Sequence, residues 1–304
     1  MPEDNSKTAL NKDRPIFIIG GSRTGSEMLK TMLSASPEID FVDEAFFNYP
    51  RWLHKDLATN IRQHVGSLEA DDAVDKLLEL LYSGIPYGWL WSEVERELDR
   101  DLLRAELSKD ALTQRSILAS VMSVHAAMRG KTGVGAKFPV HYSMTNKLLE
   151  WFPECRLIHT TRSPKDVYAS QAAKYTTSSQ NWVSRNFSRL QQFAHINIQT
   201  AGTARCHLNF QALPNYKLVR YEDVVTNPDE SIRELCEFLD VPFVEQMLAP
   251  NQYGSSYGNK KERRGIATKS IGRWREKISP AAAKMMDIAH RRAYQVLGYD
   301  AEQD

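Results

Sequence analysis

One segment near the start of the chain, Pro15–Lys30, constrains the fold more than any other. It begins with a proline and the apolar run Ile16–Ile19, which is typical of a buried strand. Three of the next six residues are glycine, and apolar residues at helical spacing follow. A helix that starts directly after such a turn directs its free N–H groups and the positive end of its dipole towards the turn. The segment therefore predicts an anion site in an α/β protein, to which Arg23 adds a forked positive charge.

The same turn differs from the Walker A loop of nucleotide hydrolases, Gly-x-x-x-x-Gly-Lys-Ser/Thr. The lysine that would reach the terminal phosphates is missing, and Glu27 stands where that pattern has a hydroxyl residue. An acid beside phosphates is costly unless it points away, although the helix dipole favours a glutamate at a helix start. Taken alone, the turn is equally compatible with an ordinary strand-to-helix connection whose glycines only relieve backbone strain.

The composition narrows the class of protein. A net charge of +1 over 304 residues argues against nucleic-acid binding through bulk electrostatics. Three widely spaced cysteines without a Cys-x-x-Cys pair disfavour a disulfide framework or a zinc site and fit a reducing compartment. The polar segment Met1–Arg14 lacks the apolar core of a signal peptide, and no run of about eighteen apolar residues is long enough to span a membrane. We therefore expect a soluble, cytoplasmic protein with a flexible N-terminus over residues 1–14.

Strands and helices alternate along the rest of the chain, which predicts one parallel sheet covered by helices. We expect a single α/β domain over residues 15–300, with segment 49–130 as a helical insertion that carries specificity. Trp89 and Trp91 in this insertion either pack in the core or form an apolar wall. The expected strands are Ile16–Ile19, Ile39–Val42, Val134–Pro139, Arg156–Thr161 and Tyr216–Arg220.

A second phosphate-type turn follows the strand Arg156–Thr161. Arg162 stands just before the next helix and Ser170 two turns into it, while Pro164 suits the first turn. If both side chains lie on the same face of the helix, they are able to bind a single phosphate. Considered alone, Arg162 is also compatible with a charged residue on the surface, and Ser170 with a solvent-exposed residue of the helix. The presence of two such turns in one α/β chain favours phosphate binding.

Together the two turns resemble those of sulfotransferases, which use 3′-phosphoadenosine 5′-phosphosulfate (PAPS). Arg23-Thr-Gly-Ser26 is similar to their 5′-phosphosulfate loop and Leu157–Ser170 to their 3′-phosphate signature, with spacing closest to the tyrosylprotein and bacterial enzymes. The resemblance implies a P-loop NTPase-like sulfotransferase fold, with adenosine 3′,5′-bisphosphate as the nucleotide product. It also implies that Arg162 and Ser170 hold the 3′-phosphate. The residues that would hold the 5′ side are Gly21, Ser22, Arg23, Thr24, Gly25 and Ser26.

Three further positions carry the same resemblance. Tyr221, within an Arg-Tyr-Glu-Asp element, matches a tyrosine that contacts the nucleotide, and Lys174 takes the place of a further nucleotide-binding arginine. The basic segment 251–275 is similar to the family's cofactor-covering loop, in which Arg273 is the expected contact. Two of these elements also have a purely structural interpretation. Tyr221 would then only stabilise a turn, and segment 251–275 would be a solvated run of charged residues.

Lys137 and Glu44 are the candidate catalytic residues. Lys137 lies twenty-five residues before Arg162, about where tyrosylprotein-type enzymes carry a lysine that contacts the bridging oxygen of the leaving group. A cation there stabilises the charge that develops on the departing phosphate. Glu44 lies twenty-one residues after Arg23, which matches the catalytic glutamate of those enzymes, and would act as the general base.

Other bases stay open. Asp43 is the base if the register is off by one residue, and His141, four residues after Lys137, is the fallback. Steroid and phenol sulfotransferases use a histidine two residues after their lysine, but Pro139 occupies that place here. His159 lies inside an apolar strand, where a histidine that is satisfied within the core is the usual finding.

The resemblance therefore implies a sulfotransferase that moves a sulfuryl group from PAPS directly to an acceptor hydroxyl. The expected acceptor is a small molecule, a lipid or a glycoside, with no nucleic acid, metal or membrane span involved. The sequence does not predict the oligomeric state. A P-loop nucleotide-binding or kinase-like protein, and a non-catalytic homologue that only binds the nucleotide, stay open as alternatives.

Overall fold

The computed structural model of the chain describes residues 11–43, 57–82, 98–138, 141–175, 182–250, 265–266 and 270–299. Within these residues, five strands form one sheet in the order β2-β3-β1-β4-β5, and every neighbouring pair is parallel. The strands are β1 (Ile16–Gly20), β2 (Ile39–Asp43), β3 (Gly133–Phe138), β4 (Arg156–Thr161) and β5 (Tyr216–Arg220). The predicted single α/β domain around a parallel sheet is confirmed.

The central position of β1 explains why its sequence is continuously apolar. Successive side chains of a strand point to opposite faces of the sheet, and helices cover both faces here. Phe17 and Ile19 enter one hydrophobic core, whereas Ile16 and Ile18 enter the other, and all four are fully buried. An alternating pattern of apolar and polar residues would place polar groups in one of the two cores.

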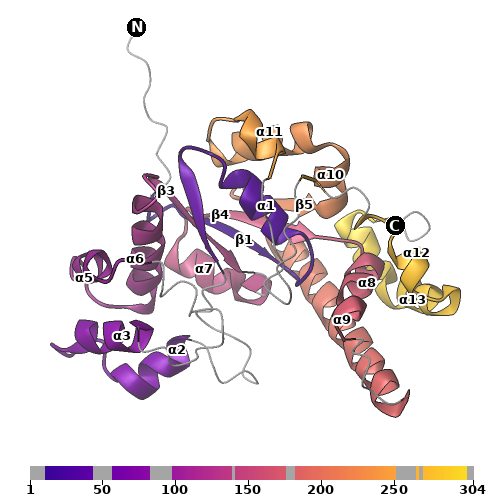
Figure 1. The fold of residues 1–304 in the computed structure, drawn as a ribbon, viewed down its shortest axis with the longest axis horizontal. Helices are drawn as coiled ribbons and strands as arrows, with labels where there is room; N and C mark the ends of the chain where they lie inside the picture. The colour runs from indigo at the N-terminus through magenta and orange to yellow at the C-terminus, as the bar shows by residue number, and fades with distance from the viewer. Residues whose placement is uncertain are drawn as a thin grey trace, which may run out of the picture.

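The two faces of the sheet are covered by different sets of helices (Figure 1). The elements that pack against Ile16 and Ile18 are α1 (Ser26–Leu33), α10 (Tyr221–Thr226), α11 (Pro228–Leu239) and η3 (Glu245–Leu248). Those that pack against Phe17 and Ile19 include α6 (Gln114–Ala127) and α7 (Thr145–Trp151), the latter preceded by the 3₁₀ turn η2 (His141–Met144).

The chain between β2 and β3 is largely helical where the structure describes it. Its helices before α6 are α2 (Leu57–Asn60), the π-helix η1 (Ile61–Val65), α3 (Ala73–Tyr82) and α5 (Arg100–Leu107). Leu77 and Leu81 of α3 are buried in the same core as Phe17 of β1, so this segment packs on the domain. Residues 44–56 and 83–97 lie outside the described residues, and with them Glu44, Trp89 and Trp91.

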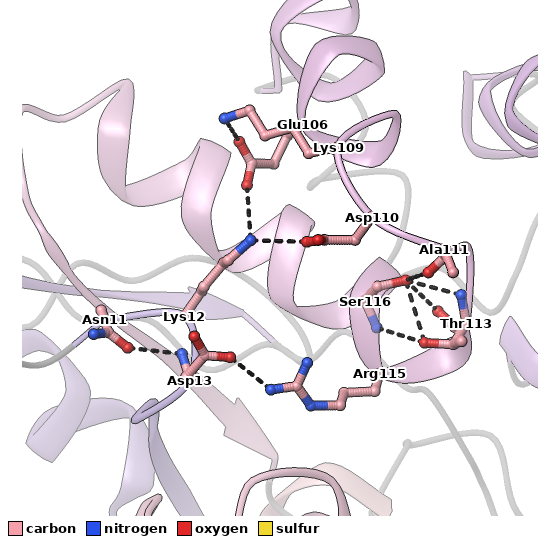
Figure 2. A network of polar contacts seen from close by, with 10 residues as sticks. All are labelled: Asn11, Lys12, Asp13, Glu106, Lys109, Asp110, Ala111, Thr113, Arg115 and Ser116. Atoms are coloured by element: carbon pink, nitrogen blue, oxygen red, sulfur yellow. Dashed lines mark hydrogen bonds and ion pairs between the residues drawn. The ribbon is translucent and has the colours of Figure 1, made fainter.

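An exposed polar network joins the segment before β1 to the connection between α5 and α6 (Figure 2). Lys12 Nζ lies 2.9 Å from Asp110 Oδ2, and Arg115 Nη2 donates to Asp13 Oδ1 at 2.6 Å. Thr113 closes a capping box at the start of α6. Exposed ion pairs contribute little to stability individually.

The remaining helices lie at the β5 side of the sheet (Figure 1). They are α8 (Pro164–Tyr175), α9 (Trp182–Phe210), α12 (Trp274–Lys277) and α13 (Pro280–Leu297). The longest of these four is α9, with 29 residues. Among the described helices, none has the length and apolar character needed to cross a membrane.

Candidate active site

The two predicted phosphate turns lie next to each other at the carboxyl end of the sheet. From β1, the chain forms β2 and β3 on one side and β4 and β5 on the other. Open α/β sheets bind ligands at such a change in strand order. Because β1 and β4 pair directly, with Gly20 opposite Thr160, the turns that follow these two strands are neighbours.

The turn after β1 is shaped by its backbone. Gly25 has a φ of +89° and Arg23 a φ of +71°, both in the left-handed region. A Cβ on Gly25 would lie 2.3 Å from Cδ2 of Tyr221, so no larger residue fits there without a shift. The helix α1 starts at the next residue, Ser26, with its first N–H groups directed at the turn. This is the backbone shape that a strand-to-helix anion site requires.

Hydrogen bonds hold this turn to the rest of the domain. The side-chain amide of Gln199 in α9 accepts from Ser22 N at 3.1 Å and donates to Ser22 O at 3.0 Å. Thr24 Oγ1 donates to Gly21 O at 2.8 Å and lies 2.8 Å from Thr160 Oγ1 of β4. The Thr24 hydroxyl and the Ser22 backbone thus fix the turn to the sheet and to α9.

The turn after β4 is shaped by side chains instead. Glu222 of α10 accepts a hydrogen bond from Ser163 N at 2.9 Å, and Tyr299 Oη donates to its other carboxylate oxygen at 3.0 Å. Burial raises the pKa of the Glu222 carboxyl above its ordinary value, while these hydrogen bonds and the Arg162 charge act in the opposite direction. A buried acid from a distant element therefore fixes the N-terminal end of α8.

Two contacts join the turns to each other. Arg23 Nε donates to Ser170 Oγ at 3.1 Å, and the Arg162 guanidinium lies 4.3 Å from the centre of the Tyr221 ring. That ring also packs against Gly25. Five residues predicted to bind the cofactor, which come from the two turns, α8 and α10, therefore form one cluster.

The segment that begins at Ser270 is docked on the start of α8. Arg162 Nη2 donates to Ser270 O at 2.5 Å. The Asp166 carboxylate accepts from Gly272 N at 2.8 Å and from Trp274 N at 3.1 Å. These three bonds hold the backbone of the segment beside the second turn.

Arg273 lies in this docked segment, and its side chain is exposed. The part of the predicted covering loop that the structure describes thus lies next to the predicted 3′-phosphate residues. Residues 251–264 and 267–269 lie outside the described residues. The covering role of the loop 251–275 therefore stays a prediction.

Lys137, near the end of β3, is buried, with 1 % of its side chain exposed. Its ammonium pairs with Oε2 of Glu27, and Oε1 of Glu27 lies 3.0 Å from Nζ of Lys30. An opposite charge offsets part of the cost of removing an ammonium from water. The contact gives a physical reason for an acid in the first turn: Glu27 reaches from α1 to the lysine of β3.

The predicted general base is not settled by these contacts. Glu44 lies outside the described residues. Asp43 ends β2 and pairs in register with Lys137 of β3, whereas His141 begins η2 and Lys174 lies in the last turn of α8. For Asp43, His141 and Lys174 the structure describes the backbone alone. The roles of all four residues stay predictions.

His159 lies in the core as expected, but of its two ring nitrogens Nε2 has no hydrogen-bond partner among the described residues. The side chain is fully buried, and Nδ1 lies 2.7 Å from Tyr216 Oη. Burial lowers the pKa of its imidazole to about 3, so the ring is neutral at physiological pH. It has the properties of a structural group rather than of a proton acceptor for an alcohol.

Several residues that shape the site were not singled out by the sequence reasoning. Gln199 of α9 holds the first turn, and Asp166 holds the late segment. Lys165 is buried and pairs with Asp287 of α13 at 3.0 Å. Asp166 and Lys165 lie inside the second motif, in the first turn of a helix that follows a buried strand. Charged residues at such a place could have indicated a structural role. Gln199 has no signal in the sequence.

The charges at the two turns fit a ligand with two separate phosphate groups. Arg23 and Arg162 contribute guanidinium groups from different turns, and Lys137 contributes an ammonium beside the first. Arg162 Nε is buried and has no hydrogen-bond partner among the described residues. A buried donor of this kind suits an anionic oxygen.

The structure thus has an α/β fold in which two strand-to-helix turns lie side by side at the carboxyl end of a parallel sheet. A sequence model of the sulfotransferase family matches residues 15–245, which is more than half of the chain, and the chain belongs to that family.

Individual relatives are distant. The chain is 22% identical to a protein-tyrosine sulfotransferase of Drosophila melanogaster over 320 aligned residues, which cover 99% of this chain and 55% of the relative. The chain therefore spans about half the length of that protein. Two solved structures share the fold. The sulfotransferase domain from the curacin biosynthetic pathway has a TM-score of 0.57 at 18% identity, covering 96% of this chain and 99% of that one. The sulfotransferase domain of the Synechococcus PCC 7002 olefin synthase has a TM-score of 0.53 at 19% identity, covering 96% and 97%.

Proposed function

We propose that this protein is an enzyme that transfers a sulfuryl group from PAPS to the hydroxyl of an acceptor. Membership of the sulfotransferase family supports the class of reaction. The observation that carries the proposal is the cluster of Arg23, Gly25, Arg162, Ser170 and Tyr221, which joins both predicted phosphate turns. Neither turn alone distinguishes PAPS from another phosphorylated ligand, whereas the pair suits a nucleotide that carries phosphate at two positions.

Each turn would hold one end of the nucleotide. The backbone and side chains of residues 21–26 would bind the 5′ side, and Arg162 and Ser170 the 3′-phosphate. The hydrogen bond between Arg23 and Ser170 supports a shared site, because it joins a residue of the first turn to a residue proposed for the 3′-phosphate. Tyr221, Lys174 and Arg273 would complete the nucleotide site.

The transfer step is a direct, in-line displacement at sulfur. The acceptor oxygen forms a bond to sulfur while the bond from sulfur to the bridging phosphate oxygen breaks, and adenosine 3′,5′-bisphosphate leaves. Lys137 would stabilise the negative charge that develops on the bridging oxygen, as cations do in phosphoryl transfer. Its burial makes this effect larger than it would be in water.

The proton of the acceptor hydroxyl would pass to Glu44. The register of β2 supports this choice, because Asp43, the residue before Glu44 in the sequence, lies opposite Lys137. Asp43 itself and His141 are the alternative bases. The acceptor is proposed to be a small molecule, a lipid or a glycoside.

A differential thermal shift tests the proposed donor. We expect adenosine 3′,5′-bisphosphate to raise the melting temperature of the protein and ATP to leave it unchanged. Stabilisation by ATP alone would favour a P-loop or kinase-like nucleotide-binding protein instead. Stabilisation by the bisphosphate without sulfate transfer to any of a panel of alcohols, phenols and glycosides would favour a non-catalytic homologue.

Replacement of Glu44 tests the general base. Glu44→Gln should lower turnover about a hundredfold or more, the size of a typical general-base contribution, and leave the affinity for the bisphosphate near that of the wild type. Glu38→Gln is the matched control, because Glu38 is an exposed glutamate at the other end of β2. Full turnover in Glu44→Gln would show that the base is another residue.

A further inference from the structure

We propose that Glu27 has two roles in the nucleotide site: it positions the Lys137 ammonium, and its charge limits how tightly the first turn holds an anion. This inference rests on the proposed function. Glu27 is the second residue of α1, so it stands within the turn that would bind the 5′ side of PAPS. Its carboxylate adds a negative charge beside a turn that would bind an anion.

The positioning role follows from the contacts of Glu27. Its carboxylate bridges two lysines, since Oε2 pairs with Lys137 of β3 and Oε1 lies 3.0 Å from Nζ of Lys30, one helical turn further along α1. Side-chain exposure falls from 25 % for Glu27 to 14 % for Lys30 and 1 % for Lys137. The carboxylate therefore holds the most buried of the three groups while it stays anchored to the helix through Lys30. A glutamate has the reach to connect α1 to β3, and an aspartate is one methylene shorter.

The second role follows from charge. Arg23 lies in the first turn, and the carboxylate of Glu27, just after the turn, pairs with two further cations, Lys30 and Lys137. At short range and in a partly buried site, a carboxylate repels an approaching phosphate and partly cancels the attraction of the lysines. An anion is thus held less tightly than the three cations and the helix dipole alone would hold it. A nucleotide product with two phosphates leaves more readily from such a site.

These roles predict an uncommon combination of effects. Most substitutions in a phosphate-binding turn weaken anion binding because they remove a donor or distort the backbone. Loss of the Glu27 charge should instead tighten binding while it slows the chemical step, because Lys137 loses the group that positions it. A glutamate that only stabilised α1 would produce neither change.

The test measures affinity and chemistry separately, and without knowledge of the acceptor. Calorimetry gives the Kd of adenosine 3′,5′-bisphosphate. The rate of the chemical step is measured as single-turnover hydrolysis of PAPS, in which water takes the place of the acceptor and sulfate and the bisphosphate are the products. Glu27→Gln should bind the bisphosphate roughly tenfold more tightly and release sulfate at least about tenfold more slowly. The gain in affinity should shrink as salt rises, because it is electrostatic.

Two variants separate the roles and control for folding. Glu27→Asp keeps the charge and shortens the reach, so it should keep the wild-type affinity and still release sulfate more slowly. Glu234→Gln is the matched control, since Glu234 is an exposed glutamate paired with Lys217 at 2.9 Å, and it should change neither quantity.

Weaker or unchanged bisphosphate binding in Glu27→Gln would overturn the inference, as would sulfate release at the wild-type rate. If the wild-type protein binds the bisphosphate and releases sulfate, either result contradicts the inference about Glu27 alone and not the proposed function. If the wild-type protein binds no bisphosphate, the proposed function fails as well.

Discussion

The two phosphate turns differ in how the chain builds them. The turn after β1 takes its shape from backbone conformation, with positive φ values at Arg23 and Gly25. The turn after β4 takes its shape from side chains, because Glu222 bonds to Ser163 N and Asp166 bonds to the late segment. The backbone shape of the first turn is set by its own residues, although distant residues such as Gln199 hold it in place, whereas the second turn takes its shape from residues far away in the sequence.

The two turns should therefore respond differently to substitution. A turn fixed by glycine tolerates almost no added atom, whereas a turn fixed by distant carboxylates loosens when one of those groups is removed. A substitution that adds atoms at a glycine of the first turn should therefore weaken nucleotide binding the most. Substitutions around the second turn should weaken nucleotide binding by smaller amounts or change the pH dependence of stability.

The largest effect is expected from Gly25→Ala. An added Cβ meets the Tyr221 ring at 2.3 Å in a left-handed backbone conformation, so both the turn and the ring must move. We expect calorimetry to show a Kd for adenosine 3′,5′-bisphosphate that is raised roughly a hundredfold or more. Gly130→Ala is the matched control, because Gly130 also has a positive φ, of +68°, but an added Cβ would meet nothing within 4 Å. Equal affinities in the two variants would remove the contrast between the turns.

A smaller effect is expected from Asp166→Ala. The change removes the acceptor for Gly272 N and Trp274 N, so the late segment loses two of its bonds to α8. The Kd for the bisphosphate should rise about tenfold, the cost of ordering the freed segment again on binding. The control is Asp229→Ala, which removes an exposed carboxylate that pairs with Arg233 in α11. An Asp166→Ala variant with wild-type affinity would show that the docked segment does not serve the nucleotide.

The smallest effect concerns the pH dependence of stability and is expected from Glu222→Gln. Burial raises the pKa of Glu222, so the folded protein keeps a proton over a pH range in which the unfolded chain has lost it. The free energy of unfolding therefore falls as pH rises from the ordinary value of 4.5 through the raised pKa. Each unit of pKa difference corresponds to about 1.4 kcal/mol.

Urea unfolding between about pH 4 and pH 8 measures this dependence. The Glu222→Gln variant should show a flatter profile than the wild type over that range. Other groups contribute to both profiles equally, so the difference between the two curves isolates Glu222. Identical profiles would mean that the buried carboxyl does not titrate on unfolding.

The fold and the first turn could be predicted from the sequence because their determinants are local. The continuous apolar run of β1 is what a strand covered on both faces requires, and Gly25 stands where a positive φ and a close ring exclude other residues. Arg162 and Ser170 could be located as well, since a proline-initiated helix after a buried strand is a local pattern.

The partners of the second turn could not be predicted in the same way. Asp166 bonds to a residue 106 positions away, and Ser163 bonds to Glu222 across 59 positions. Such contacts depend on how β5, α10 and α12 pack beside α8, and no short pattern in the sequence encodes that packing. The pairing of Glu27 with Lys137 spans 110 positions and was missed for the same reason.

The central claim is that the two turns hold the two phosphates of one nucleotide. Calorimetry with adenosine 3′,5′-bisphosphate, adenosine 5′-monophosphate and adenosine 3′-monophosphate tests it most directly. The bisphosphate should bind roughly a hundredfold more tightly than either monophosphate, because each monophosphate leaves one turn without its anion. Equal affinity for the bisphosphate and one of the monophosphates would contradict the claim, since it would mean that a single turn accounts for all of the binding.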